Sequence, residues 1–467
     1  MSPVPVSNRW EVRRLRDAVT KLVDGSHNPP PKQERGMPML SARNIENNRI
    51  VFDAFRFITD ESFATEHART RVSEDDVLLT IVGTIGRCAV VPKGAQPFAL
   101  QRSVAVLSPK HDVLSKFLSY QLQSPAIQRY FESKARGTAQ KGVYLKTLGE
   151  TPVGLPSLDD QRAVVAEIEK QFSRLDEAVA NLKRVKANLK RYKGAVLKAA
   201  VEGRLVPTEA ELARKEGRDY ETGEQLLQRI LETRRKEWKG KGKYKEPSSP
   251  DAGDIGELPE GWVWGCLDQI VARIDAGASF KCIERPPTAG ETGVLKVSAV
   301  SWGEFDEMES KTCADATRLE DDFLVKKGDF LFSRANTIEL VGACVIVNAI
   351  TKRLMLSDKT LRLRICALIP QHWALVLLRS KFGRNEVERL ATGNQESMRN
   401  IGQERIRQIR LPLPPIAEIN RILMEVERRL SMIRNAELQT DANLKRAERV
   451  RQAILSAMFR PTPTGES

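Results

Sequence analysis

The sequence predicts an α+β fold in which two mixed α/β domains are separated by two long antiparallel coiled-coil helices, with a pseudo-two-fold internal repeat. Three observations predict this fold. The chain repeats itself, each copy ends in a long helical stretch with heptad-spaced apolar residues, and each copy begins with short β-like runs joined by polar loops. The 467 residues also exceed one compact core and suggest about three domains.

The internal repeat pairs segments of the first half with segments of the second half in unchanged order. The pairs are Asn8-Arg9-Trp10 with Glu260-Gly261-Trp262, Leu40-Ser41-Ala42 with Val297-Ser298-Ala299, Asp76–Thr80 with Asp329–Ser333, Gly86-Arg87-Cys88 with Gly342-Ala343-Cys344, Leu155-Pro156 with Leu413-Pro414, and Ala187–Arg191 with Ala442–Arg446. An order kept along the whole chain is not expected by chance. The chain is therefore predicted to run domain, helix, domain, helix.

The repeat and the composition together set the expected boundaries. We expect a first domain over 1–154, a central spacer helix over 155–205, a polar connector over 206–257, a second domain over 258–412, a second spacer helix over 413–460 and a disordered tail over 461–467. The connector holds a predicted helix (Glu221–Trp238), a lysine-rich run and Pro247-Ser248-Ser249-Pro250. Proline, serine and glycine at this density are typical of a linker.

The two spacer helices each carry an apolar seam that needs a partner. In the first helix the apolar residues are Val165, Ile168, Phe172, Leu175, Val179 and Leu182, followed after a three-residue step by Val185, Leu189, Tyr192 and Val196; in the second they are Leu423, Val426, Leu430, Ile433, Leu444 and Ile454. Heptad spacing favours a coiled coil, and about 40 residues make a rod of about 60 Å. The connectivity predicts that the helices pair with each other, antiparallel. Pairing of each helix with a partner protein is the alternative.

The segments before the helices are predicted to be mixed α/β. Short β-like runs lie at Asp76–Val82, Cys88–Val91 and Ser103–Leu107 in the first copy, and at Asp329–Ser333, Ala343–Val347 and Thr360–Ile365 in the second. A helix is predicted to follow in each copy, near Lys116–Ser133 and near His372–Leu390. Polar loops join these elements, so each domain can present side chains to a ligand.

Charge favours a polyanionic partner. The formal net charge is +14 and the pI is about 9.5, which favours nucleic acid first and an acidic membrane surface second. No stretch approaches the about 20 apolar residues of a membrane span, and the N-terminus lacks a secretory apolar segment, so we expect a cytoplasmic protein. The six cysteines are scattered and only four histidines are present. This pattern favours buried, reduced thiols over a metal site or a disulfide framework.

The polar loops carry the side chains that reading of DNA bases requires. Arginine and lysine can pair with guanine, asparagine and glutamine with adenine, and others hold phosphates. The candidates in the first domain are His27, Asn28, Arg43, Asn44, Thr84, Arg87, Gln101, Arg102, Gln140 and Lys141, and those in the second are Lys296, Ser298, Arg334, Asn336, Thr337, Lys359, Asn394, Gln395 and Arg399. For any single residue the alternative is an ordinary surface polar group.

The first spacer helix has a strongly cationic stretch. From Asn181 to Lys198 it holds seven Lys and Arg and no acidic residue. Four lysines share a face and are candidates for contact with a phosphate backbone or a partner subunit: Lys183, Lys186, Lys190 and Lys193. A solvated exterior of the coiled coil is the alternative.

No catalytic or metal site is expected in this chain. Asn28-Pro29-Pro30-Pro31 is similar to the Asn-Pro-Pro-aromatic element of amino-methyltransferases, but proline stands in place of the aromatic residue that stacks on the base. No glycine-rich loop for a methyl donor and no Walker-type phosphate loop is present. These departures argue against a free-standing adenine methyltransferase.

Taken together, these segments resemble the specificity subunits of Type I restriction-modification systems, over nearly the whole chain. The resemblance lies in Asp24-Gly25-Ser26-His27, Met39–Ile45, Leu155-Pro156 and Leu258–Trp264, in doubled order, although no counterpart of Asp24–His27 is evident in the second half. It implies two target-recognition domains, double-stranded DNA as ligand, and a complex with two methyltransferase subunits and two restriction/translocase subunits. S-adenosylmethionine, ATP and Mg are then expected on those partners, and no cofactor in this chain.

The resemblance also implies a bipartite target, in which two short half-sites flank a gap of unspecified bases and adenine N6 is methylated by the partner. A pseudo-two-fold protein suits DNA, whose half-sites then lie in inverted orientation at a separation set by the protein, about 34–36 Å per helical turn. Two alternatives remain. The specificity part of a Type IIB-like restriction enzyme would have the same architecture, and a basic coiled-coil protein that bridges DNA non-specifically would account for the charge.

Overall fold

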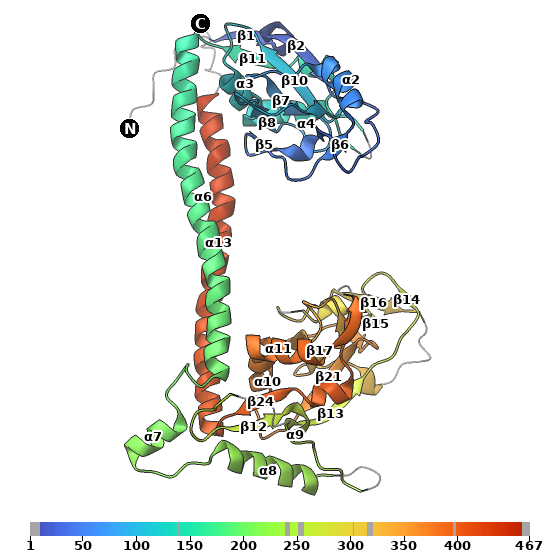
Figure 1. The fold of residues 1–467 in the computed structure, drawn as a ribbon, viewed down its shortest axis with the longest axis vertical. Coiled ribbons are helices and arrows are strands. Elements are labelled where there is room, and N and C mark those ends of the chain that lie inside the picture. The colour runs from blue at the N-terminus through green and yellow to red at the C-terminus, as the bar shows by residue number, and fades with distance from the viewer. Residues whose placement is uncertain are drawn as a thin grey trace. The chain divides into compact units, whose positions relative to one another are not determined.

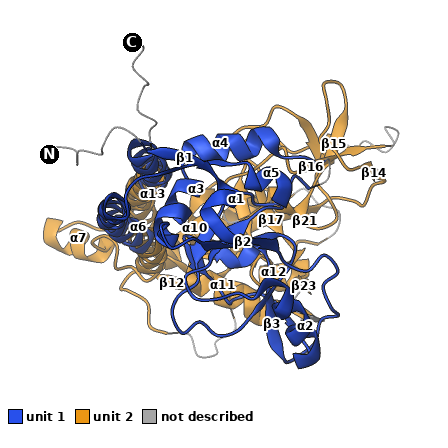
Figure 2. Ribbon diagram, turned by 90° about the horizontal axis from the view of Figure 1, so that it is seen from above, with its two compact units in different colours: residues 1–184, 440–467 blue, residues 185–439 orange. Residues whose placement is uncertain are grey.

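The computed structural model describes residues 10–137, 140–238, 243–250, 256–301, 303–314, 321–395 and 398–459. The backbone of Asn394 and Gln395 is described without their side chains. Asn8-Arg9, Lys239, Lys241 and the predicted tail at 461–467 lie outside these residues. The chain forms two compact units (Figure 2), residues 1–184 with 440–467 (unit 1) and residues 185–439 (unit 2), and each long helix contributes one part to each unit.

Unit 1 is built on a four-stranded antiparallel sheet with a smaller sheet beside it. The order of the first is β2 (Val19–Asp24), β10 (Val104–Pro109), β7 (Val77–Thr80), β8 (Cys88–Val90), and that of the second is β6 (Arg56–Ile58), β3 (Met37–Leu40), β9 (Ala99–Leu100). Two-stranded sheets join β1 (Glu11–Arg14) to β11 (Pro152–Leu155) and β4 (Ile45–Glu46) to β5 (Arg49–Ile50). The helices are α1 (Leu15–Ala18), α2 (Asp60–Thr70), α3 (Ser115–Leu122), α4 (Pro125–Lys134) and α5 (Leu145–Gly149).

The central strands of unit 1 are buried on both faces. Val77 and Leu79 face one hydrophobic core while Leu78, between them, faces another, as the period of a strand requires. The first core continues into the start of α6 (Leu158–Val201) and the end of α13 (Ile416–Met458), through Phe172 and Leu455. The long helices are therefore part of the core of unit 1 (Figure 1).

Unit 2 repeats this plan and adds a further three-stranded sheet. Its sheets run β13 (Val271–Ala276), β21 (Thr360–Ile365), β17 (Phe330–Ser333), β19 (Cys344–Ile346), and β14 (Cys282–Ile283), β16 (Ser310–Cys313), β15 (Thr292–Leu295), β20 (Arg353–Met355). β12 (Val263–Cys266) pairs with β24 (Arg410–Leu413), and β18 (Ala335–Asn336), β23 (Met398–Asn400) and β22 (Thr392–Gln395) form a third sheet. The helices are α9 (Leu267–Ile270), α10 (Gln371–Arg379), α11 (Lys381–Leu390) and α12 (Gln403–Arg407), with α7 (Glu209–Glu216) and α8 (Gly223–Lys236) from the connector.

The predicted α+β fold with an internal repeat is confirmed. The sheet order β2-β10-β7-β8 recurs as β13-β21-β17-β19. The turn after the third strand recurs too, because Gly86 N donates to Thr80 O and Gly342 N donates to Ser333 O, each at 2.8 Å. Both glycines have positive φ, which explains why glycine stands in both copies.

One pairing of the repeat is shifted by two residues from the sequence prediction. β3 ends at Leu40 and is followed by a 3-10 turn over Ala42–Asn44, whereas β15 ends at Leu295 and is followed by a 3-10 turn over Val297–Ala299. Leu40-Ser41-Ala42 therefore corresponds to Leu295-Lys296-Val297. The sequence prediction was shifted because Ser41-Ala42 and Ser298-Ala299 have the same two residue types.

Each long helix predicted inside the domains is two helices. In unit 1, α3 ends at Leu122 and α4 begins at Pro125, since proline has no N–H to continue the first helix. In unit 2 the break falls at Ser380, whose Oγ accepts a hydrogen bond of 3.1 Å from Gly383 N and so caps α11. The connector also holds α7, which the sequence did not predict, beside α8.

The long helices α6 and α13 pack antiparallel, as predicted. In unit 1 the Arg451 guanidinium of α13 lies 4.1 Å from the ring centroid of Phe172 on α6 and pairs with Asp176. In unit 2 the end of α6, including Val196, shares a core with Ile419 at the start of α13. No helix in the described part of the chain is long and apolar enough to cross a membrane.

The seam of α6 differs from the predicted one after Leu182. Val185 and Tyr192 are 44% and 46% exposed, whereas Leu189 is half-buried and Val196 is buried. The register of Leu182, Leu189 and Val196 continues without a three-residue step, so Val185 and Tyr192 lie beside the seam. Val185 and Tyr192 therefore lie on the exposed surface of the helix.

Candidate nucleic-acid interface

Three loops of unit 1 meet at Ser103. Its carbonyl oxygen accepts from Ile81 N at 2.9 Å, and its Oγ accepts from Ala42 N at 3.0 Å. The adjacent Arg102 N donates to Ser26 O at 2.8 Å. These hydrogen bonds thus bring together the loops that carry His27, Asn28, Arg43, Gln101 and Arg102, which are distant in sequence.

A second loop pair carries the other candidates of unit 1. Gly83 N donates to Lys141 O at 3.1 Å, which joins the loop of Thr84 and Arg87 to that of Gln140 and Lys141. Ile81 lies at the start of this loop and bonds to Ser103, so both groups of candidates belong to one connected set of loops. Eight of the ten have exposed side chains: His27, Asn28, Arg43, Thr84, Arg87, Arg102, Gln140 and Lys141.

Asn44 and Gln101 are the less exposed members of this set. Gln101 is half-buried, and Asn44 is only 2% exposed. The Asn44 Oδ1 accepts from Ser41 N at 3.0 Å, and its Nδ2 donates to Val51 O at 2.9 Å and to Ala54 O at 3.1 Å. Its amide is occupied within the chain, so Asn44 holds the loop that presents Arg43.

His27 is held in place by a carboxylate. Its Nε2 lies 2.8 Å from Asp24 Oδ2, and the other oxygen of Asp24 accepts from the Arg69 guanidinium at 3.0 Å. Asp24 is 8% exposed, while the His27 side chain is 52% exposed. A buried acceptor therefore orients an accessible imidazole and leaves its Nδ1 available to a ligand. Arg69, on α2, is a residue of this arrangement that the sequence did not suggest.

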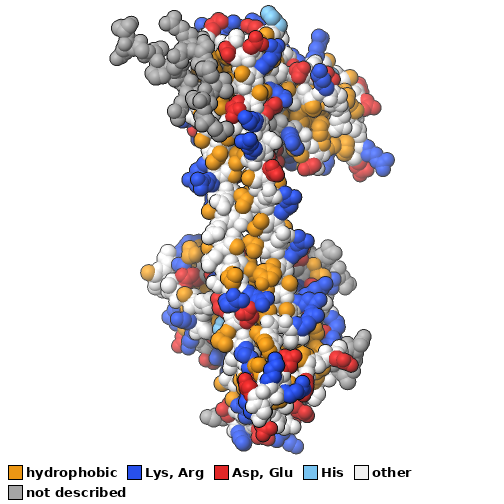
Figure 3. All heavy atoms as spheres, turned by 90° about the vertical axis from the view of Figure 1, so that its left-hand side faces the viewer, with side chains coloured by type: hydrophobic (Ala, Val, Ile, Leu, Met, Phe, Trp, Pro, Cys, Tyr) orange, Lys and Arg blue, Asp and Glu red, His pale blue; other side chains and the backbone are white. Residues whose placement is uncertain are grey.

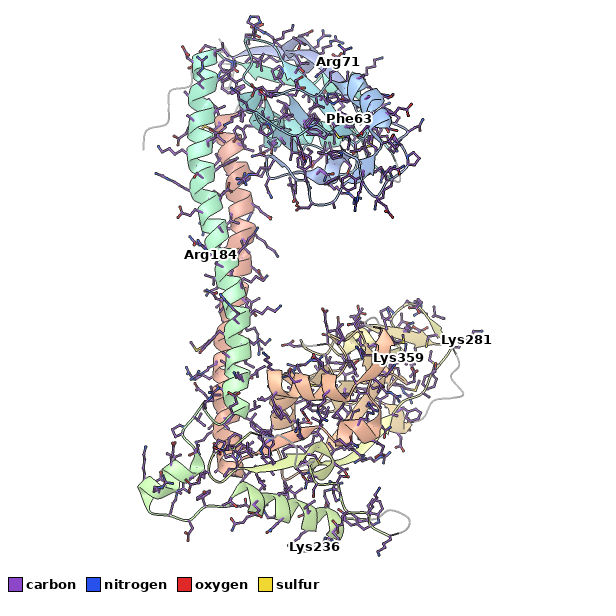
Figure 4. All side chains as sticks on the ribbon, in the orientation of Figure 1. Phe63, Arg71, Arg184, Lys236, Lys281 and Lys359 are labelled. Carbon is purple, nitrogen blue, oxygen red and sulfur yellow. The ribbon has the colours of Figure 1, made fainter. Side chains whose placement is uncertain are left out.

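In unit 2, three of the candidates line one cavity. Lys296, Ser298 and Lys359 are in the wall of a cavity of about 440 Å³. Figure 4 labels Lys359 there, and it labels Lys281 on the loop next to β14. The hydroxyl of Ser298 donates to Glu309. The cavity is also lined by residues that the sequence did not indicate, among them Phe280, Cys282, Glu284, Lys311 and Asp358.

The remaining candidates of unit 2 lie on or beside the three-stranded sheet next to this cavity. Arg334 N donates to Lys359 O at 3.0 Å and Arg334 O accepts from Ile401 N at 2.9 Å, so Arg334 links the two places. Asn336 lies directly opposite Arg399 in the β18–β23 pair. The other candidates here are Thr337, which follows β18, and Asn394 and Gln395, whose backbone forms part of β22.

The structure supplies the counterpart of Asp24–His27 that was not evident in the sequence. It is Ala276-Gly277-Ala278-Ser279, because Ala278 bridges Ser357 in unit 2 as Ser26 bridges Gln101 in unit 1. A Cβ on Gly25 would collide with Leu100 O, and a Cβ on Gly277 with Leu356 O. Close approach of two backbones is thus the shared requirement, and glycine is the one letter that the two segments keep.

A buried ion pair supports this segment in unit 2. Arg362 Nε donates to Asp275 Oδ2 at 2.8 Å, and both side chains are less than 5% exposed, at 3% and 4%. Burial disfavours the charged form of Asp275, but hydrogen bonds from Arg362 and Arg364 outweigh it, so the pKa of Asp275 is lowered. Arg362 also donates to Asp329 at 3.0 Å and so ties β13 and β17 to β21.

The four lysines of α6 all lie on one continuous helix. Lys183, Lys186 and Lys190 are exposed and Lys193 is half-buried. Hydrophobic side chains also show on the long helices in Figure 3, and the exposed ones include Tyr192, Met424, Met432 and Leu438. The helices therefore present cationic and apolar groups together.

Comparison with known proteins finds sequence similarity to specificity subunits of Type I restriction enzymes. Residues 8–191 match the family model described as the Type I restriction modification DNA specificity domain. The chain is similar to the EcoEI specificity subunit of Escherichia coli (30% identical over 274 residues, 58% of this chain and 44% of that relative) and to the EcoKI specificity subunit of E. coli strain K12 (21% over 442 residues, 92% and 83%). The first of these alignments thus spans less than half of the relative's length.

A solved structure supports the likeness at the level of fold. The structure concerns the "structural basis underlying complex assembly and conformational transition of the type I R-M system". It matches with a TM-score of 0.64 at 17% identity, over 98% of this chain and 100% of that chain. At this identity the match shows the fold alone. The resemblance to Type I specificity subunits that the sequence predicts is confirmed.

Proposed function

On the premise that residues 8–191 form a Type I restriction-modification DNA specificity domain, we propose that the whole chain is the sequence-recognition subunit of a Type I restriction-modification enzyme. The observation that carries the proposal is the doubled fold: the same four-strand order, β2-β10-β7-β8 and β13-β21-β17-β19, occurs once in each unit. Two homologous recognition domains that differ in their loops suit a bipartite target with two different half-sites.

Each domain reads one half-site through its connected loops. In unit 1 the exposed Arg43, Arg87 and Arg102 suit guanine edges or phosphates, and His27 adds an oriented imidazole. In unit 2 the lysines in the cavity wall, Lys296 and Lys359, suit the same contacts. One domain reading a few base pairs discriminates by about 1–3 kcal/mol per base pair, so two linked domains are needed for a rare site.

The chemistry belongs to partner subunits in this proposal. Two methyltransferase subunits supply adenine-N6 methylation from S-adenosylmethionine, and two restriction subunits supply ATP- and Mg-dependent translocation and cleavage. This chain has no catalytic step of its own and works in the cytoplasm, directing the partners to the target. Lys183, Lys186, Lys190 and Lys193 then contact either a partner subunit or phosphates.

Methylome mapping tests the proposal. The chain is co-expressed with the methyltransferase subunit encoded beside it, in a host without adenine methylation, and N6-methyladenine is mapped by long-read sequencing. We expect one gapped motif methylated in both halves, and none when this chain is omitted. A variant of the chain with Arg43→Ala and Arg87→Ala tests the proposed contacts, and its methylation of the motif should fall.

Two results would count against the proposal. Methylation without a sequence motif, together with duplex binding that has a steep salt dependence and no preferred sequence, would show a non-specific DNA-bridging protein. No methylation with a folded and expressed partner would show that this chain does not direct it.

A further inference from the structure

Two cysteines of unit 2 that are far apart in sequence face each other across a pair of strands. Cys282 on β14 lies directly opposite Cys313 on β16. The neighbouring pair is joined by a hydrogen bond of 2.9 Å from Ala314 N to Lys281 O. Because hydrogen-bonded and non-hydrogen-bonded pairs alternate in an antiparallel ladder, Cys282 and Cys313 form a non-hydrogen-bonded pair, the kind in which opposite side chains lie closest.

This geometry suits a disulfide. Non-hydrogen-bonded partners have Cα atoms about 4.5 Å apart, which lies within the range of about 4.4–6.8 Å that a disulfide spans. Directly opposed residues also point to the same face of the ribbon. The two thiols can therefore bond without a change of strand register.

The pair differs from the other cysteines in exposure. Cys282 and Cys313 are half-buried, whereas Cys88, Cys266, Cys344 and Cys366 are buried. The expectation of six buried thiols is thus wrong for these two. Burial, with Cys313 adding to it, raises the pKa of the Cys282 thiol, while the ammonium of Lys311 acts in the opposite direction. A soluble oxidant can reach this pair more readily than the four buried thiols.

The next residues along the same face connect the pair to the cavity. Glu284 directly follows β14, and it forms an ion pair with Lys311, which lies two residues before Cys313 on β16. Cys282, Glu284 and Lys311 all line the cavity that also holds Lys296 and Lys359. A covalent link between Cys282 and Cys313 would fix the strands where this ion pair forms, and so keep the Lys311 ammonium on Glu284.

We propose that Cys282 and Cys313 form a reversible disulfide that clamps β14 to β16 and weakens DNA binding by unit 2. The effect on DNA rests on the proposed function, whereas the disulfide itself does not. With Lys311 held by Glu284, the cavity loses one of its three lysines as a contact for a phosphate or a guanine edge.

The oxidant is a peroxide. The thiolate of one cysteine attacks a peroxide oxygen, the O–O bond breaks, and a sulfenic acid forms while the leaving hydroxide takes a proton and becomes water. The sulfur of the second cysteine then attacks the sulfenic sulfur. The S–S bond forms, the S–O bond breaks, and the hydroxyl leaves with the thiol proton as a second water. The two thiols lose two electrons and the peroxide gains them; a dithiol reductant reverses the bond.

Unit 1 provides an internal comparison. In its smaller sheet, Gln33 bridges Phe57 as Ile283 pairs with Thr312 in unit 2, so the positions that match Cys282 and Cys313 hold Lys32 and Ile58. Neither residue can be oxidised to a disulfide. The half-site read by unit 1 should therefore not respond to peroxide.

The test begins with the full chain treated with hydrogen peroxide and digested without reduction. Mass spectrometry should find an intramolecular peptide pair that links Cys282 to Cys313, with the four buried cysteines unmodified. Cys282→Ser and Cys313→Ser should each abolish the linked pair. Absence of the linked pair in the folded wild-type chain, or a link only between two chains, would overturn the proposal.

Binding to a duplex that carries the mapped motif tests the consequence. We expect the oxidised wild-type chain to bind at least about fivefold more weakly, dithiothreitol to restore binding, and both serine variants to be insensitive to peroxide. A duplex whose unit 2 half-site is scrambled should bind equally with and without peroxide. A disulfide that forms without changing affinity for the motif would overturn the regulatory part. If neither form binds the motif, the proposed function fails together with the effect on DNA, and the peptide mapping still decides whether the pair reacts.

Discussion

The indole Nε1 of Trp262 donates a hydrogen bond of 3.0 Å to Oε1 of Glu418, and Glu418 is fully buried. The second oxygen of Glu418 accepts from Glu209 N at 2.8 Å. One carboxylate therefore joins the start of α13 to the connector helix α7 and to the segment that opens the second repeat. Trp262 also packs edge-to-face on Trp373, which places this junction at the core of unit 2.

Replacing Glu418 by alanine should destabilise unit 2. The change leaves two buried donors, Trp262 Nε1–H and Glu209 N–H, without their acceptor, at a cost of about 1–3 kcal/mol each. Urea unfolding of the full chain measures the loss as a lower midpoint. The matched control is Asp159→Ala, an acidic residue near the start of α6 whose side chain is 92% exposed, and it should change the midpoint little.

The same carboxyl should make stability depend on pH. Burial, the largest influence, raises the pKa of Glu418 above 4.5, and the hydrogen bonds from Glu209 N and Trp262 Nε1 act against it. Its contribution to stability is fully present below the unfolded pKa and is lost as the pH rises through the folded pKa. Glu418→Gln cannot ionise, so the stability of wild type relative to this variant should fall as the pH rises. A difference that is constant with pH would contradict the shift.

Substituting the close-approach glycines should disrupt the recognition loops. Gly277→Ala places a methyl group against Leu356 O, and the backbone must move to accept it. We expect weaker binding to the mapped motif and a lower unfolding midpoint. Gly194→Ala is the control, because a Cβ added at Gly194 on α6 would meet nothing within 4 Å, and it should raise stability by about 0.5–1 kcal/mol.

The repeat was predictable because its turns have strict local requirements. Gly86 and Gly342 need a positive φ, and Asp76 and Asp329 open equivalent strands, so these letters recur at matching places. The counterpart of Asp24–His27 could not be predicted from the sequence, because Gly277 is the one residue there whose type is required by the close backbone contact. A comparison of sequences detects shared side chains, whereas this contact is made by main-chain atoms and leaves the other residue types free to differ.

Pairing across strands and helices was the other part that the sequence did not show. Cys282 and Cys313 become neighbours through strand register, which is set by the whole sheet. In the long helix, the apolar residues Val185 and Tyr192 suggested a seam, but both are exposed, whereas Leu189 is half-buried and Val196 is buried. The exposed candidates for DNA contact stay predictions.

Breaking the buried ion pair between Arg362 on β21 and Asp275 on β13 should cost more than removing an exposed partner of the same carboxylate. Arg362→Met leaves Asp275 buried without its main counter-charge, which costs about 3–5 kcal/mol. Arg364→Met removes another donor to Asp275, at 2.9 Å, from a side chain that is 49% exposed, and should cost at most about 1 kcal/mol. Equal losses in urea unfolding would show that burial of Arg362 does not matter.

The length of the coiled coil should control the unspecified gap. If α6 and α13 act as spacers in the proposed function, shortening α6 between Val179 and Lys190 changes the gap in the methylated motif or abolishes methylation. Circular dichroism of the variant verifies that the helices remain. An unchanged gap in a methylating variant would show that something other than these helices sets the spacing.

Substitutions in one unit should alter one half-site only. His27→Ala removes an imidazole that Asp24 orients at 2.8 Å, and Lys359→Ala removes a lysine from the wall of the cavity in unit 2. Each loss should relax the choice of base at one position by about 1–3 kcal/mol, or about five- to 150-fold. Methylome mapping of each variant identifies the position, and the two should fall in opposite halves of the motif. The controls are His111→Ala and Lys381→Ala, which are exposed residues of the same types in the same units. A single variant that relaxes both halves would contradict independent reading, because it would require one domain to contact both half-sites.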